Sequence, residues 1–322
     1  YRAPWWLPGG HLQTLYSALV AKPRRLSLAR TRWETPDGDF VDVDWLDGPA
    51  DAPLVVLFHG LEGNAGSHYA RAMMHGLRAA RWRGAVPHFR SCSGELNRLP
   101  RAYHSGDSAE IGWMLARFGE AARGAPLFAA GISLGGNALL KWLGETGDAA
   151  RERVVAAAAI SAPLDLAAGS AAIERGFSML YTRMFLSTLK RKIAAKARRH
   201  GPPFDAPRVA RLRTMREFDE IVTAPLHGFE GADDYYARSS ARGFLGAIRV
   251  PTLVLNAQND PFLPARHLPA VTELSQFVTL ETPRQGGHAG FVTGPFPGHL
   301  RWLPRRIIAF FSTQLPASES AP

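Results

Sequence analysis

One short stretch, Gly131–Gly136 with the sequence GISLGG, constrains the fold of this chain more than any other. The apolar run 126–130 precedes it, and residues 137–143 follow with apolar side chains at helical spacing. A G-x-S-x-G sequence between a strand and a helix is typical of a sharp turn, in which glycines leave room for the reversing chain. We therefore predict that Ser133 projects its hydroxyl from a strand–helix turn, at the helix N-terminus. An ordinary glycine–serine turn before a helix is the alternative.

Apolar runs and helical patterns alternate along most of the 322 residues. Strands are expected at 53–58, 85–90, 127–132, 153–160, 251–256 and 277–280, and helices at 67–80, 107–118 and 301–311. Continuous apolar strands are typical of a parallel sheet that is covered on both faces. Residues 31–36 and 40–46 are expected to form a hairpin. The pattern predicts an α/β fold with a mostly parallel central sheet flanked by helices.

The alternation stops between residues 163 and 246, where the pattern is helical throughout. We interpret 163–246 as a helical cap, inserted after the strand that follows the Ser133 turn, and residues 1–162 and 247–322 as the core. The basic run 190–199 in this segment is expected to be a solvated helix face, with contact to anionic lipid or substrate as the alternative.

The formal net charge is +10, mostly from arginine, which raises nucleic acid or an anionic membrane as partners. No nucleic-acid-binding motif accompanies the charge, so nucleic acid is not expected, and peripheral membrane contact stays open. The chain has one cysteine, Cys92, and no apolar run of about 18 residues, and we expect no secretory signal. These features favour a cytoplasmic location and an inert, buried thiol.

No metal and no organic cofactor is expected. His59, His88 and His104 are isolated in the sequence, and neither H-E-x-x-H nor C-x-x-C occurs. A dinucleotide is excluded because no G-x-G-x-x-G opens the first strand–helix turn.

A serine hydroxyl needs a base to become a nucleophile, and the base needs an acid that orients it. Both partners are expected at strand ends after Ser133, because sites in open α/β folds form at the carboxyl edge of the sheet. Asp260 follows the strand 251–256, and His288 lies in a glycine-rich loop after the last strand. We predict a triad of Ser133, Asp260 and His288. Helix capping by Asp260 and a solvated His288 are the alternatives, and weaker candidates are His267, His299, Asp233 and Asp234.

The charge that develops on the attacked carbonyl oxygen needs backbone donors. Leu134 N–H is one candidate, because the first amides of a helix lack partners within it. The second is expected from the loop after the strand 53–58, and we select Leu61 N–H there. A plain turn at His59–Gly60 is the alternative. In the cap, Met179, Met184 and Phe185 suggest an apolar acyl pocket, although ordinary packing would also account for them.

Eight segments together resemble the YheT-like branch of the α/β-hydrolases: 9–14, 59–64, 89–95, 103–107, 131–137, 224–229, 233–236 and 259–262. The resemblance covers residues 4 to 312. Two positions depart from the family pattern. Ser91 stands where the family usually has glycine, which affects the local turn. Asn259 replaces the first of two acids before Pro-Phe, which leaves Asp260 as the orienting acid.

The resemblance implies the α/β-hydrolase fold and a serine hydrolase whose triad maps onto Ser133, Asp260 and His288. Relatives include esterases of short and medium acyl esters, and some act on phospholipids or transfer acyl groups to alcohol. A small-molecule acyl ester is therefore the expected substrate, with acyl transfer, thioester cleavage or phospholipid hydrolysis as alternatives. A non-catalytic basic lipid-binding protein is the alternative of another class.

Overall fold

An eight-stranded sheet organises the computed structural model, which describes residues 1–201 and 206–315. The strands are β1 (Ala29–Glu34), β2 (Phe40–Leu46), β3 (Leu54–Phe58), β4 (Arg83–Pro87), β5 (Leu127–Ile132), β6 (Ala156–Ile160), β7 (Thr252–Leu255) and β8 (Val278–Glu281). Their order is β1-β2-β4-β3-β5-β6-β7-β8. The β1–β2 and β2–β4 pairs are antiparallel, and β3 to β8 pair in parallel with their neighbours. The predicted mostly parallel sheet is confirmed.

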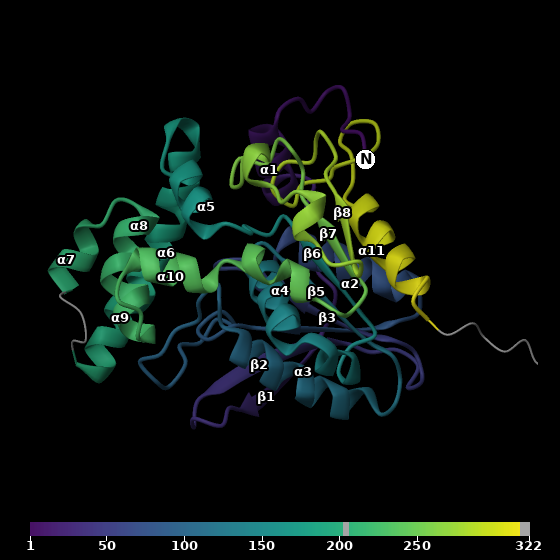
Figure 1. Ribbon diagram of the computed structural model, residues 1–322, viewed down its shortest axis with the longest axis horizontal. Coiled ribbons are helices and arrows are strands. Elements are labelled where there is room, and N and C mark those ends of the chain that lie inside the picture. Colours follow the sequence, from purple (N-terminus) through teal and green to yellow (C-terminus); the bar gives the residue numbers. More distant parts are fainter. Residues whose placement is uncertain (202–205, 316–322) are drawn as a thin grey trace, which may run out of the picture.

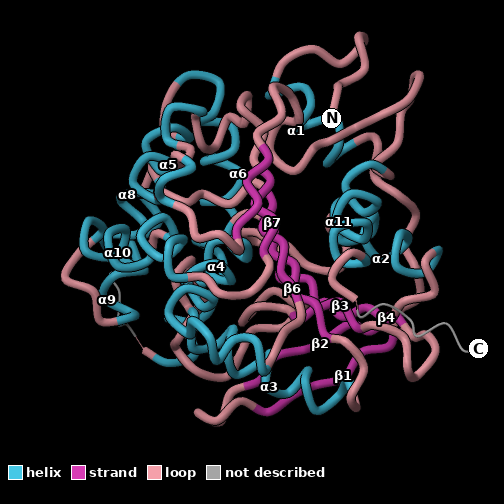
Figure 2. Tube along the Cα trace, turned by 45° about the vertical axis from the view of Figure 1, so that its right-hand side comes forward, coloured by secondary structure: helices cyan, strands magenta, loops and turns pink. Residues whose placement is uncertain are grey.

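Helices cover both faces of this sheet (Figures 1 and 2). One face carries α2 (His68–Ala79) and α11 (Trp302–Ser312), and the other carries α3 (Ser108–Ala122) and α4 (Leu134–Thr146). Side chains alternate along each strand, so Val55 and Leu57 join the α2–α11 core, whereas Val56 and Phe58 join the α3–α4 core. Burial on both faces explains why these strands are apolar without interruption.

Between β6 and β7 lies a helical segment that gathers at one end of the molecule (Figure 1). It contains α5 (Leu166–Ile173), α6 (Met179–His200), α7 (Ala206–Arg211), α8 (Met215–Phe218), α9 (Ala224–His227) and α10 (Ala232–Ser239), and no strand among its described residues. Side chains of α5, α6 and α8 share an apolar cluster of their own. At its end, Ala241 and Leu245 join the main core instead. We use "the inserted segment" below for residues 163–246.

Several elements differ from the sequence-based expectation. Helix α1 (Gly10–Leu19) was not predicted, because the residues it buries are Gln13, Thr14 and Ser17. A polar buried face leaves no apolar periodicity in the sequence. Strand β4 ends at Pro87 rather than at residue 90, since proline cannot donate a ladder hydrogen bond. Helix α3 runs on to Ala122, four residues beyond the expected end.

The turn between β5 and α4 tolerates no side chain at Gly135. A Cβ there would lie 2.6 Å from the backbone oxygens of Phe58 and His59. We expect Gly135→Ala to lower the free energy of unfolding by about 2–3 kcal/mol, because backbone atoms must move. Gly119→Ala in α3 is the matched control, since a Cβ there meets nothing within 4 Å. It should stabilise the protein by about 0.5–1 kcal/mol. Urea unfolding followed by circular dichroism measures both, and equal effects would contradict this packing argument.

Candidate active site

Ser133 stands between β5 and α4 with φ of 54° and ψ of −120°. This left-handed conformation is costly for a residue with a Cβ and is found where the surrounding structure enforces it. The Ser133 amide donates to the carbonyl oxygen of Ile160, at the end of β6, over 2.8 Å. Behind the turn, a Cβ on Gly131 would lie 2.5 Å from the Gly135 oxygen. Helix α4 can therefore pack this closely against the end of β5 only because residue 131 is glycine. The predicted strand–turn–helix geometry is present.

Asp260 and His288 lie side by side at the same edge of the sheet. His288 Nδ1 is 2.9 Å from Asp260 Oδ2 and 3.1 Å from Oδ1. The Asp260 carboxylate is fully buried, and 11% of the His288 side chain is exposed. Asp260 Oδ1 also accepts the Phe262 amide over 2.8 Å, and the Phe262 ring stacks on His288 with centroids 3.9 Å apart. Asp260 is thus held by a turn and faces the imidazole.

The loop that carries His288 is joined to the end of β6, next to the Ser133 turn. Ala289 N donates to the hydroxyl of Ser161 over 3.0 Å, and Ser161 follows the Ile160 carbonyl that binds Ser133. The parallel strands therefore bring the three predicted triad residues to one sheet edge.

Helix α1 holds both loops of the Asp260–His288 pair. Thr14 Oγ1 accepts the His288 amide over 2.9 Å. Gln13 Oε1 accepts the Gly286 amide over 2.9 Å and the Asn259 side-chain amide over 3.0 Å. Gln13 and Thr14 both lie in the 9–14 motif. This motif was the sequence signal that could have indicated that they hold the loops of Asp260 and His288.

The loop after β3 approaches Ser133 closely. A Cβ on Gly60 would lie 3.1 Å from the Ser133 Cβ. The Gly60 amide donates to the Tyr69 hydroxyl over 2.9 Å, and the Glu62 amide donates to the Tyr103 hydroxyl over 2.8 Å. Both amides that flank Leu61 are thereby occupied. We call residues 59–63 the oxyanion loop, after the donor that the sequence predicts at Leu61.

His59 fixes the peptide that contains the Leu61 N–H. Its Nδ1 is 2.8 Å from the Gly60 carbonyl oxygen, and its Nε2 accepts the Phe89 amide over 3.0 Å. Because Nε2 accepts, the proton is on Nδ1, which donates to Gly60. Complete burial lowers the pKa of His59 to about 3, so the ring stays neutral in this role. The Gly60 carbonyl belongs to the same peptide unit as the Leu61 N–H, whose direction is therefore set as well.

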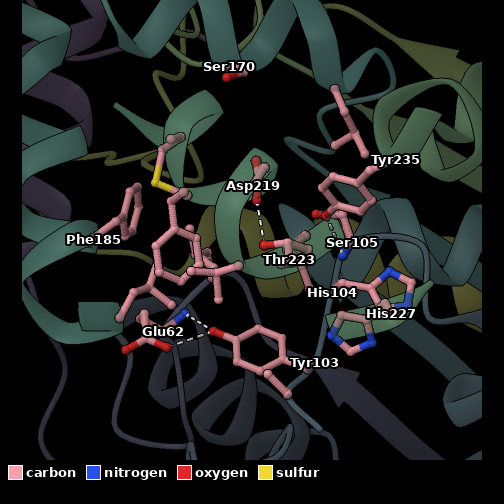
Figure 3. Close-up of a pocket in the computed structure, with 18 of the residues that line it drawn as sticks. Glu62, Tyr103, His104, Ser105, Ser170, Phe185, Asp219, Thr223, His227 and Tyr235 are labelled. Carbon is pink, nitrogen blue, oxygen red and sulfur yellow. Dashed lines mark hydrogen bonds between the residues drawn. The ribbon is translucent and has the colours of Figure 1, made fainter. Parts of the chain in front are cut away.

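Ser133 opens into a cavity of about 140 Å³ between the core and the inserted segment. Leu61, Leu134 and Phe262 line it near Ser133, and Phe185 lines it from α6 (Figure 3). Met179 and Met184 are not among its lining residues, and half of the Met184 side chain is exposed. Of the three predicted acyl contacts, the structure places Phe185 in the cavity wall.

The chain is similar to known hydrolases over most of its length. A family model described as alpha/beta hydrolase fold matches residues 53–295. "Putative esterase YheT" of Escherichia coli (strain K12) is 39% identical over 312 residues, which cover 95% of this chain and 91% of that protein. The chain belongs to the YheT-like α/β hydrolases.

Two more distant relatives of this YheT-like hydrolase carry other names. "Phospholipase ABHD3" of Mus musculus is 29% identical over 91% of this chain and 73% of that protein. "Medium-chain fatty acid ethyl ester synthase/esterase 2" of Saccharomyces cerevisiae (strain ATCC 204508 / S288c) is 28% identical over 81% of this chain and 62% of that protein. The names of these relatives differ in the ester chemistry that they state.

The weaker triad candidates of this YheT-like hydrolase have other partners. His267 Nδ1 lies 3.7 Å from an Asp165 carboxylate oxygen, and His299 contacts Thr293. Asp233 pairs with Arg216 on the surface, and the Asp234 carboxylate accepts the Glu230 amide at the start of α10. Among the described residues, no group of three or more histidine, cysteine, aspartate or glutamate side chains is placed to hold a metal ion.

The cavity wall of the hydrolase also contains buried titratable groups outside the predicted triad (Figure 3). His104 and His227 stand with ring centroids 4.4 Å apart, and burial lowers their pKa values to about 4 and about 3. Asp219 accepts the Thr223 hydroxyl over 2.7 Å and the Tyr236 hydroxyl over 2.8 Å. Burial raises the pKa of Asp219 to about 6. These groups add to a lining that combines apolar side chains with charged ones such as Glu62 and Lys192.

Asp219 should make stability depend on pH in a defined window. Its folded pKa of about 6 exceeds the ordinary value of 3.8, so the folded protein binds the extra proton between pH 4 and 6. Stability then falls as pH rises through this window. We expect Asp219→Asn, which cannot ionise, to gain up to about 3 kcal/mol relative to wild type between pH 4 and 7. Urea unfolding at each pH measures the difference, and exposed Asp233→Asn should show no such gain. A difference that stays constant with pH would contradict the assignment.

Among the described residues, no helix is long and apolar enough to cross a membrane.

Proposed function

We propose that this YheT-like hydrolase cleaves short- to medium-chain carboxylic esters through Ser133, His288 and Asp260. The observation that carries the proposal is the 2.9 Å contact between His288 Nδ1 and the buried Asp260 carboxylate, at the sheet edge that carries the Ser133 turn. A histidine that is held by a buried carboxylate and lies at the same sheet edge as a strained serine can serve as the base that a serine hydroxyl needs. The esterase name of the YheT relative supports the same chemistry.

The proposed reaction has two halves. Ser133 Oγ attacks the ester carbonyl while His288 Nε2 takes the hydroxyl proton, and Asp260 stabilises the imidazolium and its tautomer. The N–H groups of Leu61 and Leu134 receive the oxyanion. The tetrahedral intermediate collapses to the acyl-enzyme, and His288 returns its proton to the leaving alcohol. Water, activated by His288, then attacks the acyl-enzyme and releases the acid.

The acyl chain is proposed to occupy the cavity against Phe185, and Met179 and Met184, which do not line this cavity, are left out of the proposal. Hydrolysis of phospholipids is the second candidate, favoured by the name of the ABHD3 relative. Transfer of the acyl group to an alcohol is the third, favoured by the yeast ester synthase/esterase. All three use the same proposed triad and differ in the leaving group or in the acceptor. A cytoplasmic location and peripheral contact with anionic membranes stay predictions.

The test is hydrolysis of p-nitrophenyl esters from acetate to palmitate, together with covalent labelling by a fluorophosphonate. We expect turnover with an optimum at short or medium chains, and a single phosphonylated residue, Ser133, identified by mass spectrometry. Added ethanol distinguishes acyl transfer, because ethyl esters then accumulate beside free acid. Absence of both turnover and label, with the protein folded, would exclude the serine hydrolase and leave the basic lipid-binding protein.

A further inference from the structure

Two lysines of the basic run point toward the core rather than into solvent. Lys196 Nζ lies within hydrogen-bond distance of three backbone oxygens, those of Leu99, Pro100 and Arg101. Lys192, one turn earlier on α6, places Nζ 2.7 Å from Glu62 Oε1. Lys190 differs, since it donates to the carbonyls of Ala210 and Leu212 within the inserted segment. The expected solvated face is therefore in part a contact between α6 and core loops.

The partner of Lys192 belongs to the oxyanion loop. Glu62 directly follows Leu61 and has a φ of 55°, a left-handed conformation that its environment must hold in place. Its carboxylate accepts the Tyr103 hydroxyl over 2.8 Å (Figure 3). The same carboxylate oxygen also accepts Lys192. The carboxylate is largely buried, with 9% of the side chain exposed, so the ammonium group compensates a charge that water reaches poorly.

Lys192 connects the oxyanion loop to the inserted segment. The other polar side chains that bind this loop, those of His59, Tyr69 and Tyr103, come from the core, whereas Leu61 also packs against the apolar cluster of the inserted segment. Lys192 has Cys92 Sγ as a further neighbour at 3.5 Å. Burial raises the pKa of that thiol to about 11, so it stays neutral and does not replace Glu62 as a counter-ion.

We propose that Lys192 is a positioning residue, which makes a complete oxyanion site depend on the docking of α6 against the core. The inference rests on the proposed function, because it assigns Leu61 N–H as a donor. When α6 is docked, Lys192 holds Glu62 and thereby the backbone next to Leu61. Without Lys192, hydration would lower the free energy of the Glu62 carboxylate, which therefore turns toward water. This movement releases the Leu61 end of the loop. The loss should affect the transition state more than the bound ester.

The test compares three substitutions on α6: Lys192→Met, Lys196→Met and Lys190→Met. Loss of one oxyanion donor lowers kcat by about 10²–10³-fold, so a displaced donor should cost about 10–100-fold in Lys192→Met. We expect KM to change less than threefold in this variant. Lys196→Met removes a contact of the same helix with core residues 99–101 and leaves the Lys192–Glu62 pair in place, so kcat should change little. Lys190→Met should match wild type, and Lys192→Arg should restore most of kcat.

A readout that needs no turnover separates this inference from the proposed function. Amide hydrogen exchange of residues 59–64, followed by mass spectrometry, should be at least about tenfold faster in Lys192→Met than in wild type and unchanged in Lys190→Met. Unchanged kcat and exchange in folded Lys192→Met, with active wild type, would overturn the coupling alone. Equal kinetic patterns in Lys192→Met and Lys196→Met would do the same. If the wild type were inactive, the proposed function would be overturned. Faster exchange of residues 59–64 in Lys192→Met would then show only that Lys192 holds the loop, without a role in catalysis.

Discussion

Ser133→Ala is expected to lower kcat for p-nitrophenyl esters by at least about 10³-fold. The variant keeps the turn and the cavity but has no oxygen that can form the acyl-enzyme. KM should change little, because the hydroxyl contributes little to binding of the ground-state ester. Steady-state kinetics with the best substrate of the chain-length series measures the loss, and the fluorophosphonate should no longer label the protein.

Alanine has a Cβ like serine, so it places the same steric demand on the left-handed backbone at position 133. The fold should therefore be retained. Ser161→Ala is the control, because Ser161 lies at the neighbouring strand end and binds the Ala289 amide. We expect it to reduce kcat far less than Ser133→Ala does. Turnover that survives Ser133→Ala would show that another residue is the nucleophile.

Asp260→Asn is expected to lower kcat by about 10⁴-fold at pH 7. Oδ1 of Asp260 accepts the Phe262 amide, so the carbonyl oxygen of an asparagine must occupy that place. The amide NH2 group then faces His288 Nδ1 and donates to it. This forces the proton of the neutral imidazole onto Nε2, where it blocks the uptake of the serine proton. Steady-state kinetics of both proteins over a range of pH measures the effect on kcat.

Asp233→Asn is the matched control for this substitution. Asp233 was a weaker candidate in the sequence, and its carboxylate pairs with Arg216 on the surface. Its loss should leave kcat within twofold of wild type. If Asp260→Asn retained wild-type kcat while Asp233→Asn lost it, the assignment of the orienting acid would be wrong.

The sheet and the Ser133 turn could be predicted because both depend on local sequence. Strands buried on two faces must be apolar throughout, and a helix that starts against β3 must begin with glycines. The candidate site followed from topology. Parallel strands end at one edge, so residues after β5, β7 and β8 meet there whatever their separation in sequence.

Other features could not be predicted, because they depend on contacts between distant segments. A lysine at helical spacing looks the same whether it meets water or Glu62, which is 130 residues away. Helix α1 contacts the core through amides and hydroxyls, and no period of apolar residues indicates such a contact. Met184 was predicted to contact the acyl chain because it is an apolar residue in the expected cap. In the structure half of its side chain is exposed.

The contacts of α1 determine when the candidate active site can be completed during synthesis of the chain. Thr14 and Gln13 find their partners 274 and 273 residues later, at His288 and Gly286. The Ser133 turn and the α6 cluster are translated well before those partners exist. A chain emerges at roughly 5–20 residues per second, so α1 waits on the order of 15–60 s for the loop that it anchors. Nascent chains therefore carry the proposed nucleophile, Ser133, before the loop of the proposed base, His288, can be held by α1.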